Sequence, residues 1–187
     1  MTDRCLVLLS GGIDSLVCAE ELRQAGQLAG CVFVDYAHPA QVAEGWKAFA
    51  YCGTREVPLK TVHAFGLDLG DMTAQHAARV VPSRNALLLS LAANVAPSMG
   101  ADALVIGCNR ADDRDYADCR RDFLDAVQLA LGMPVLSPLI GLEKAQIIAK
   151  ARALGLTQGD AWSCYTGGPK ACGECPSCLE ADQAWQR

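Results

Sequence analysis

The sequence lacks three features that would place the protein on a nucleic acid, in a membrane or outside the cell. Its 16 Lys and Arg residues are outnumbered by 21 Asp and Glu, which gives a net charge of −5. The basic residues are scattered, and this balance does not suit binding to a phosphate backbone. No apolar stretch approaches the roughly 18 residues of a membrane span, and residues 1–5 lack the layout of a signal peptide. We therefore expect a cytoplasmic protein that binds neither nucleic acid nor membrane.

Internal repeats, low-complexity tracts and convincing linkers are also missing from the sequence. Its 187 residues are 51% hydrophobic and 20% charged, with a mean hydropathy of +0.16. Such a chain has enough apolar surface to fold, so disorder is not expected. One core is expected, because the length suits a single mid-sized domain.

Strand and helix patterns alternate along the chain and predict a doubly wound α/β fold with a mainly parallel sheet. We interpret residues 1–160 as the main domain and residues 161–187 as a cysteine-rich lobe packed on it. Residues 60–81 have no clean periodicity and are expected to form a long connection. The expected strands cover residues 5–9, 31–34, 55–59 and 103–106, and the expected helices cover about 14–25, 39–51, 83–96, 117–131 and 143–154.

In a doubly wound sheet, ligands bind at the carboxyl ends of the strands. Three segments should therefore meet at one edge: the turn over residues 10–15, Asp35–Tyr36 and Gly107–Asn109. The turn reads Ser-Gly-Gly-Ile-Asp-Ser between a buried strand and a helix. Its glycines let the backbone approach a ligand, and the N–H groups at the helix start favour a pyrophosphate. A tight turn in which Ser10 or Asp14 only caps the helix is the alternative.

The ten cysteines fall into two groups. Six are spread through ordinary or apolar segments and are typical of small buried residues; these are Cys5, Cys18, Cys31, Cys52, Cys108 and Cys119. Near the C-terminus, Cys172, Cys175 and Cys178 form a C-x2-C-x2-C run, with Cys164 upstream. Four thiolates at these spacings predict a closed, structural zinc site. An iron-sulfur cluster is the main alternative, although the cysteine that follows such runs in ferredoxins is missing, and disulfides are a third interpretation.

The turn over residues 10–15 resembles the signature of the PP-loop ATP pyrophosphatases, which cleave ATP between its α and β phosphates. The two familiar nucleotide motifs, G-x-x-x-x-G-K-[ST] and G-x-G-x-x-G, are absent. The resemblance implies a PP-loop, HUP-like fold that uses ATP with Mg²⁺. It also implies that Asp14 and Ser15 act in catalysis and that the pyrophosphate is held by Ser10, Gly11, Gly12, Asp14 and Ser15.

Further blocks narrow the resemblance to the 7-cyano-7-deazaguanine synthase family. The likeness covers residues 5 to about 180, and its blocks are specific only when taken together. Besides the cysteine run, they are Val81–Asn85, Ile106–Asn109, Asp118–Phe123, Ser137–Lys144 and Trp162–Tyr165.

Members of this family convert 7-carboxy-7-deazaguanine and ammonia into the nitrile with two ATP molecules, in queuosine biosynthesis. The chemistry explains two adenylations, because a carboxylate and then an amide oxygen must each be activated before it can leave. The resemblance implies a carbon–nitrogen ligase with small-molecule substrates. A homodimer is left open.

Four polar residues are candidates for contact with ATP or substrate. Arg84 or Arg120 could bind a phosphate or the substrate carboxylate through two hydrogen bonds. Asp118 could accept two hydrogen bonds from the guanine-like edge, and Asn109 lies where the fourth strand ends. The plain alternatives are surface salt bridges for the arginines and helix capping for Asp118.

The sequence departs from the family pattern near the expected substrate edge. Family members usually read Tyr-Gly-Gln-x-His where this chain has Tyr36–Gln41, and Asp-Tyr-Ser-Gly-Tyr-Pro where it has Asp112–Ala117. The arginine that commonly follows the last cysteine is absent from Leu179–Asp182. The phosphate turn and the cysteines are intact, which suggests retained activation chemistry with an altered acceptor or nucleophile.

Three functions therefore remain open. In the first, ammonia attacks and the product is the free nitrile. The second resembles the synthase-like proteins of anti-phage systems, in which the activated carboxylate is joined to an amine on a protein partner. The third is a binding module without turnover, which the complete turn over residues 10–15 argues against.

Overall fold

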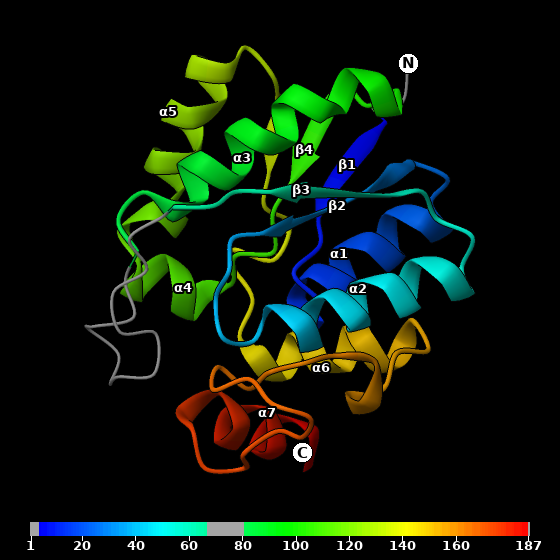
Figure 1. Cartoon of the computed structure of the whole chain (residues 1–187), viewed down its shortest axis with the longest axis vertical. Helices are drawn as coiled ribbons and strands as arrows, with labels where there is room; N and C mark the ends of the chain where they lie inside the picture. Colours follow the sequence, from blue (N-terminus) through cyan, green and yellow to red (C-terminus); the bar gives the residue numbers. More distant parts are fainter. Residues whose placement is uncertain (1–3, 67–80, 187) are drawn as a thin grey trace.

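The computed structural model describes residues 4–66 and 81–186 and contains one five-stranded, parallel sheet (Figure 1). The strands lie in the order β3-β2-β1-β4-β5, and every neighbouring pair is parallel. The chain therefore winds in one direction from β1 to β3 and in the other through β4 and β5. The strands are β1 (Cys5–Leu8), β2 (Leu28–Asp35), β3 (Leu59–His63), β4 (Ala103–Val105) and β5 (Val135–Leu136).

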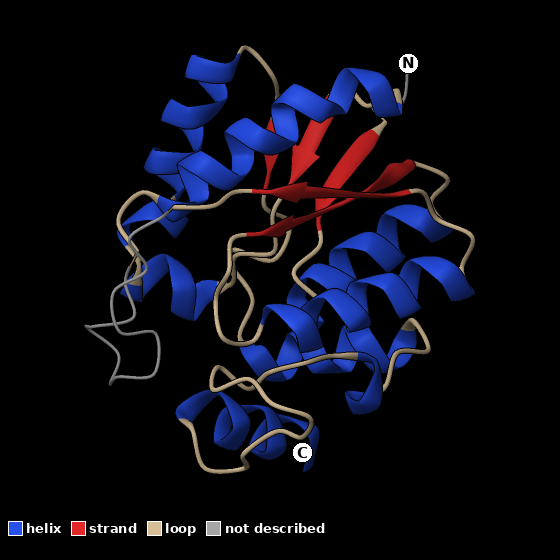
Figure 2. Ribbon diagram, viewed as in Figure 1, coloured by secondary structure: helices blue, strands red, loops and turns tan. Residues whose placement is uncertain are grey.

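Helices cover both faces of this sheet (Figure 2). Helices α1, α2 and α6 pack on one face, whereas α3 and α5 pack on the other. The described helices are α1 (Ile13–Gln24), α2 (Gln41–Thr54), α3 (Arg84–Val95), α4 (Arg110–Asp115), α5 (Arg121–Leu131), α6 (Lys144–Ala153) and α7 (Pro176–Gln186). Short 3₁₀ turns are η2 (Ala96–Met99), η3 (Ala117–Cys119) and η4 (Gln158–Asp160).

Strand β1 lies at the centre and supplies both halves of the core. All four of its residues are buried. Because successive side chains point to opposite faces, Cys5 and Val7 pack against α1 and α6, while Leu6 and Leu8 pack against α3. The near-continuous apolar run seen in the sequence is therefore the pattern of a strand buried on both faces.

Two expected elements were wrong in position. The third strand was expected over residues 55–59 but covers Leu59–His63, so all of it except Leu59 lies in the segment expected to be a loop. This strand lies at the sheet edge and is only partly buried, so its polar residues give no apolar run. The helix expected over residues 117–131 begins as η3 and continues as α5, and α4 before it was missed because its six residues are almost all charged.

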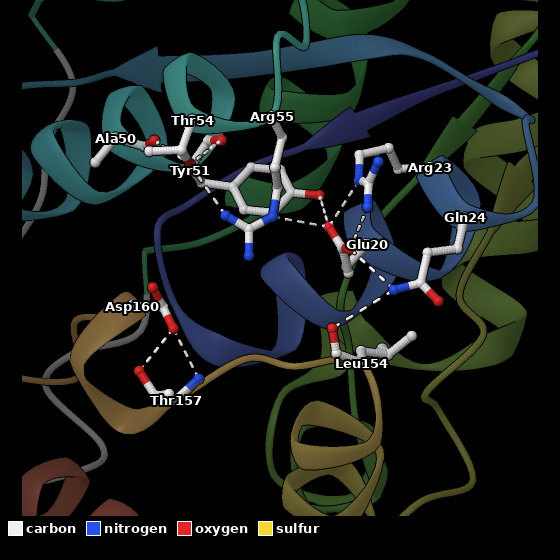
Figure 3. A network of polar contacts seen from close by, with 10 residues as sticks. All are labelled: Glu20, Arg23, Gln24, Ala50, Tyr51, Thr54, Arg55, Leu154, Thr157 and Asp160. Atoms are coloured by element: carbon white, nitrogen blue, oxygen red, sulfur yellow. Dashed lines mark hydrogen bonds and ion pairs between the residues drawn. The ribbon is translucent and has the colours of Figure 1, made fainter.

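A buried carboxylate joins α1 to α2 (Figure 3). Glu20 is 2% exposed and accepts hydrogen bonds from Arg23 and Gln24 of its own helix. The Tyr51 hydroxyl and the Arg55 Nε each add one at 3.0 Å. Burial raises the pKa of Glu20, but the hydrogen bonds from Arg23, Gln24 and Tyr51 outweigh it and lower that pKa to about 2.

The segment after α6 lies against the main sheet domain at the end of the molecule that carries α7 (Figure 1). Ala184 and Trp185 of α7 join the core cluster formed with α1 and α6. The boundary between residues 160 and 161 remains our interpretation, since the two parts share this packing. Within residues 4–66 and 81–186, no helix has the length and apolar character that crossing a bilayer would require.

Candidate functional site

A cavity of about 310 Å³ opens at the carboxyl ends of β1, β2 and β4. Strands β1 and β4 are neighbours in the sheet but not in the sequence, so the winding direction reverses between them. Ligands of doubly wound folds bind at such a reversal point. The cavity walls include all three segments expected to meet there, represented by Ser10, Tyr36 and Gly107.

The turn over residues 10–15, which we call the phosphate turn after the ligand expected of it, connects β1 to α1 and is held by its own hydroxyl groups. The Ser15 hydroxyl donates to the carbonyl of Gly12 at 2.9 Å and lies 3.2 Å from the Ser10 hydroxyl. The Ser10 backbone N–H donates to the same Ser15 oxygen. No side chain caps α1 at Gly12, so the helix start is available for an anion. Ser10 Oγ accepts the N–H of Gly12 at 3.3 Å, just before the helix, and binding of a pyrophosphate at this turn stays a prediction.

Two glycines are required by close backbone approaches around this turn. Gly11 has a φ of +79°, and a Cβ there would lie 2.4 Å from the carbonyl oxygen of Glu44 in α2. At the end of β4, a Cβ on Gly107 would lie 2.9 Å from the backbone nitrogen of Ser15. Both distances are shorter than real side-chain contacts, so larger residues would push the turn away from its neighbours.

Asp14 is the charged centre of the cavity. Lys144, the first residue of α6, donates from Nζ to both carboxylate oxygens of Asp14 at 2.7 and 2.9 Å. The Asn109 side-chain amide donates to Asp14 Oδ2 at 3.1 Å. Two elements that are distant from α1 in the sequence, α6 and the start of α4, therefore hold this carboxylate beside the phosphate turn.

Asn109 has both ends of its side chain occupied. Its oxygen accepts from the backbone N–H groups of Ala111 and Asp112, which caps α4, while its amide nitrogen faces Asp14. The residue is 4% exposed. We expected Asn109 to bind substrate; the structure places it at the cavity but gives it the contacts of a group that orients Asp14.

The ion pair between Asp14 and Lys144 dominates the charge in this part of the cavity. Burial lowers the pKa of Lys144, but attraction to Asp14 and hydrogen bonds to it outweigh burial and raise that pKa. For Asp112, burial is the main cause and raises the pKa to about 6, against a hydrogen bond from the backbone of Asn109. The Lys144 ammonium therefore lies between two carboxyl groups of the cavity, Asp14 and Asp112, whose environments differ.

Arg84, at the first turn of α3, lines the same cavity together with Tyr36 and Tyr165. Burial lowers its pKa, but interaction with both tyrosines and Asp118 raises it. The guanidinium is thus a permanent positive charge that faces the same space as the phosphate turn. This placement agrees with the contact to ATP expected of Arg84, which stays a prediction.

Asp118 and Arg120 lie outside the lining of this cavity. A carboxylate oxygen of Asp118 accepts a hydrogen bond from the backbone N–H of Asn85 at 3.0 Å. Asp118 therefore supplies a partner for a free N–H group in the first turn of α3. The Asn85 side chain returns a bond to the Asp118 carbonyl. Arg120 is exposed in a separate, shallow depression with Asp122 and Asp125. The substrate roles expected for Asp118 and Arg120 stay predictions that this geometry does not favour.

Four cysteine sulfur atoms come together beside the cavity. The Sγ atoms of Cys164, Cys172, Cys175 and Cys178 all lie within 4.8 Å of one another. Cys164 and Cys172 are 3.5 Å apart, and Cys172 and Cys178 are 3.9 Å apart. Sulfur atoms bound tetrahedrally at 2.3 Å from one ion are about 3.8 Å apart, so this cluster has the size of a single-ion site. The cluster predicted from the spacing is therefore present.

Backbone N–H groups support the thiolate form of this cluster. The N–H of Cys172 points to Cys164 Sγ at 3.4 Å, and that of Cys175 points to Cys172 Sγ at 3.3 Å. Donors from Glu174 and Cys175 lower the pKa of Cys172 to about 6. Metal ligands must be deprotonated, and such donors favour that state.

Several cavity residues were missed from the sequence. Lys144 belonged to a family block but was given no role, and Asp112, Trp162 and Tyr165 were not singled out as site residues. One signal was available for Lys144. A lysine at the first position of a helix is unfavourable because the helix start already has partial positive charge, so its position indicates another partner.

Comparison with known proteins agrees with this geometry. Residues 4–187 match the family described as "Queuosine biosynthesis protein QueC". The chain belongs to the QueC family. It is 33% identical to a 7-cyano-7-deazaguanine synthase of Desulforudis audaxviator, over 96% of this chain and 94% of that protein. It is also 33% identical to one from Thermoplasma acidophilum, over 94% of this chain and 84% of that protein.

Solved structures share the fold of this QueC-family chain. NMN synthetase from Francisella tularensis aligns with a TM-score of 0.57 at 14% identity, over 98% of this chain and 84% of that one. U34-tRNA thiolase NcsA from Methanococcus maripaludis, solved with its [4Fe-4S] cluster, aligns with a TM-score of 0.56 at 16% identity. That alignment covers 98% of this chain and 63% of that chain. The predicted doubly wound α/β fold with a parallel sheet and a C-terminal cysteine cluster is confirmed.

Proposed function

We propose that this QueC-family chain uses ATP to activate the carboxylate of 7-carboxy-7-deazaguanine and makes the nitrile 7-cyano-7-deazaguanine with ammonia. The observation that carries the proposal is the uncapped start of α1 beside Asp14 and Lys144, at the sheet's reversal point. Full-length relatives named 7-cyano-7-deazaguanine synthase support the substrate.

The proposed reaction has two activation steps. A carboxylate oxygen of the substrate attacks the α-phosphorus of ATP, pyrophosphate leaves, and a mixed anhydride with AMP forms. Ammonia attacks the carbonyl carbon and displaces AMP, which gives the amide. The amide oxygen then attacks a second ATP in the same way, and loss of AMP and a proton gives the nitrile.

The described residues suit the negative charge that develops on the leaving pyrophosphate. The turn between Ser10 and Ser15 offers backbone N–H groups, and Lys144 and Arg84 place two cations around the same cavity. Preorganised charge of this kind is usually the largest contribution to such catalysis. Asp14 is the carboxylate that would hold the Mg²⁺ which accompanies ATP, and Asn109 orients it.

We further propose that the four cysteines bind one structural Zn²⁺. Their sulfur separations suit a single tetrahedral ion, whereas a four-iron cluster would need room for four metal ions between the same sulfurs. A site with four protein ligands has no open position, so this ion would hold the lobe together and take no part in the reaction. Metal analysis and the absorption spectrum of the purified protein distinguish the two, because an iron-sulfur cluster absorbs visible light.

One observation favours a second candidate, in which a protein amine replaces ammonia. The segments that depart from the family pattern supply cavity residues, among them Asp112, Tyr116 and Glu180, while the phosphate turn is retained. Activation by ATP would then be unchanged, and the acceptor would differ. This version ends at an amide that links the deazaguanine to its protein partner.

The test is an incubation of metal-loaded protein with ATP, Mg²⁺ and 7-carboxy-7-deazaguanine, with and without ammonia. Pyrophosphate release and product mass are followed. Ammonia-dependent nitrile supports the first function. Adenylate or amide without nitrile, with a mass shift on a partner protein, supports the second. Absence of pyrophosphate in every condition contradicts both.

Asp14→Ala tests the role of the turn within the same assay. We expect the protein to remain folded and pyrophosphate release to be abolished, because the carboxylate beside the phosphates is gone. Asp125→Ala is the matched control, since Asp125 is an exposed aspartate on α5 outside the cavity. Pyrophosphate release by Asp14→Ala at the rate of Asp125→Ala would refute the role assigned to Asp14.

A further inference from the structure

One carboxylate of the cavity wall is held in place but keeps its hydrogen-bonding capacity. Glu44, in the first turn of α2, lines the cavity, and its side chain is 17% exposed. His38 Nε2 lies 3.2 Å from Glu44 Oε2, an ion-pair distance, but the two groups are not aligned as a hydrogen bond. Within residues 4–66 and 81–186, no donor makes a hydrogen bond to the Glu44 carboxylate, so both of its oxygens can accept from a ligand.

Two other carboxylates of the wall are already engaged by the protein. Asp14 accepts hydrogen bonds from Lys144 and Asn109, and Asp112 accepts one from the backbone N–H of Asn109. Glu44 differs from both, because its neighbour His38 fixes its position without using its oxygens in hydrogen bonds.

His38 also supports an aromatic side chain of the same wall. Its ring stacks on that of Tyr36, with the ring centroids 4.4 Å apart and the planes at 26°, and Tyr36 lines the cavity. His38 itself is 3% exposed and lies in the segment Tyr36–Gln41, where the chain departs from the family pattern. One buried ring therefore contacts both an aromatic ring and a carboxylate that line the cavity.

We propose that Tyr36 and Glu44 form the subsite for the guanine-like ring of the substrate and that His38 positions both; this inference rests on the proposed function. The Tyr36 ring stacks on the flat bicycle. The Glu44 carboxylate accepts hydrogen bonds from N1–H and from the 2-amino group, which are adjacent donors on the six-membered ring. The substrate carboxylate is on the five-membered ring, so this edge can be held while the carboxylate reacts. Asp118, which the sequence suggested for this contact, lies outside the cavity lining.

The same chemistry separates this subsite from one for the adenine of ATP. The corresponding edge of adenine has an amino donor beside an unprotonated ring nitrogen, whose lone pair a carboxylate repels. An ionised carboxylate is an acceptor only, so Glu44 favours the guanine-type edge with its two adjacent donors. Sites that hydrogen-bond an N–H group of a substrate also reject analogues that lack it.

The experiment titrates the full-length, metal-loaded protein by calorimetry with 7-carboxy-7-deazaguanine and with the same molecule lacking the 2-amino group. The wild-type protein should bind the first compound on the order of 10- to 100-fold more tightly, because the second loses a hydrogen bond to a charged group. Glu44→Gln keeps the shape of the side chain and should lose most of this preference. Tyr36→Leu should weaken the binding of both compounds equally and keep the preference, since the ring stacks on either one.

Two further variants separate positioning from folding. His38→Phe keeps a ring against Tyr36 but removes the nitrogen beside Glu44, so it should lower the preference while the compound without the amino group binds nearly as before. Glu21→Gln is the matched control, because Glu21 lies outside the cavity and pairs with Lys150; it should bind both compounds like the wild type. Thermal unfolding of each variant checks that it is folded.

The possible outcomes distinguish this inference from the proposed function. A Glu44→Gln protein that keeps the wild-type preference would overturn the subsite and leave the proposed function standing, since the deazaguanine still binds. A Glu44→Gln protein whose affinity for ATP falls as much as its affinity for the deazaguanine would assign these residues to adenine and also overturn the subsite. A wild-type protein that binds neither compound would overturn both the subsite and the proposed function.

Discussion

The backbone N–H of Trp162 donates a 2.9 Å hydrogen bond to the carbonyl of Gly11, which joins the cysteine-bearing segment directly to the phosphate turn. A second contact lies nearby, where a Cβ on Gly167 would be 2.2 Å from the carbonyl oxygen of Pro39, just before α2. The metal site and the cavity are therefore mechanically connected. Disturbing one should disturb the other.

The first prediction concerns the cysteine cluster. Cys175→Ser should lose the metal and raise amide hydrogen exchange across residues 161–186. Structural zinc binds in small peptides with about 10–16 kcal/mol of apparent free energy, which exceeds what the contacts of this short segment supply. Through Trp162 and Gly11, pyrophosphate release should fall as well. Cys52→Ala is the control, and it should keep its metal. Full metal content and unchanged exchange in Cys175→Ser would contradict the proposed site.

The second prediction compares two glycines. Gly11→Ala should abolish pyrophosphate release, because the new Cβ would meet the Glu44 carbonyl and the residue has a positive φ. Gly53 lies in α2 with open space around it. Since Ala is preferred to Gly in helices by about 1 kcal/mol, Gly53→Ala should leave activity intact and raise the midpoint of urea unfolding. Equal activity of the two variants would show that the turn tolerates displacement.

The third prediction concerns the cation at Asp14. Lys144→Met keeps most of the side-chain length but removes the charge, and pyrophosphate release should fall on the order of 10²-fold, as when one preorganised electrostatic group is lost. Lys150→Met is the control on the same helix, because Lys150 pairs with Glu21 outside the cavity. Rates measured at saturating ATP separate a loss of turnover from weaker binding. A similar rate for both variants would exclude Lys144 from the reaction.

The fourth prediction follows from the pKa of Glu20. Its folded value of about 2 lies below its ordinary value of 4.5. The contribution of ionised Glu20 to the free energy of unfolding is therefore complete above about pH 4.5 and is lost as the pH falls towards 2. At neutral pH, Glu20→Gln should lower the free energy of unfolding by about 2–3 kcal/mol, because hydrogen bonds to a charged group are lost. The difference in free energy of unfolding between Glu20→Gln and the wild type, measured by urea titration, should become smaller below pH 4.5.

Glu21→Gln is the control for the buried carboxylate. Its ion pair with Lys150 is partly exposed, and such pairs contribute about 0–1 kcal/mol. Its effect on unfolding should be small and should not share the pH profile of Glu20→Gln. A deficit for Glu20→Gln that stays constant from pH 7 to acid would mean that the carboxylate is not charged in the folded protein.

The sequence by itself determined the fold class, the phosphate turn over residues 10–15 and the cysteine cluster. Each follows from a local pattern in the sequence. These patterns are the apolar run of β1, the paired glycines before α1 and the short spacings from Cys172 to Cys178. Such features depend only on residues close together in the chain. A buried strand or helix also shows its characteristic apolar periodicity wherever it lies in the fold. The edge strand β3 was misplaced because partial exposure removes that pattern.

Only the tertiary structure decided what surrounds Asp14. Lys144 lies 130 positions away in the sequence and Asn109 lies 95 positions away, and they meet because α6 packs on α1 while β4 pairs with β1. The same packing moved Asp118 to the start of α3 and brought Cys108 and Cys119 to the cavity wall. Contacts of this kind depend on how whole elements pack, which no pattern within a single element encodes.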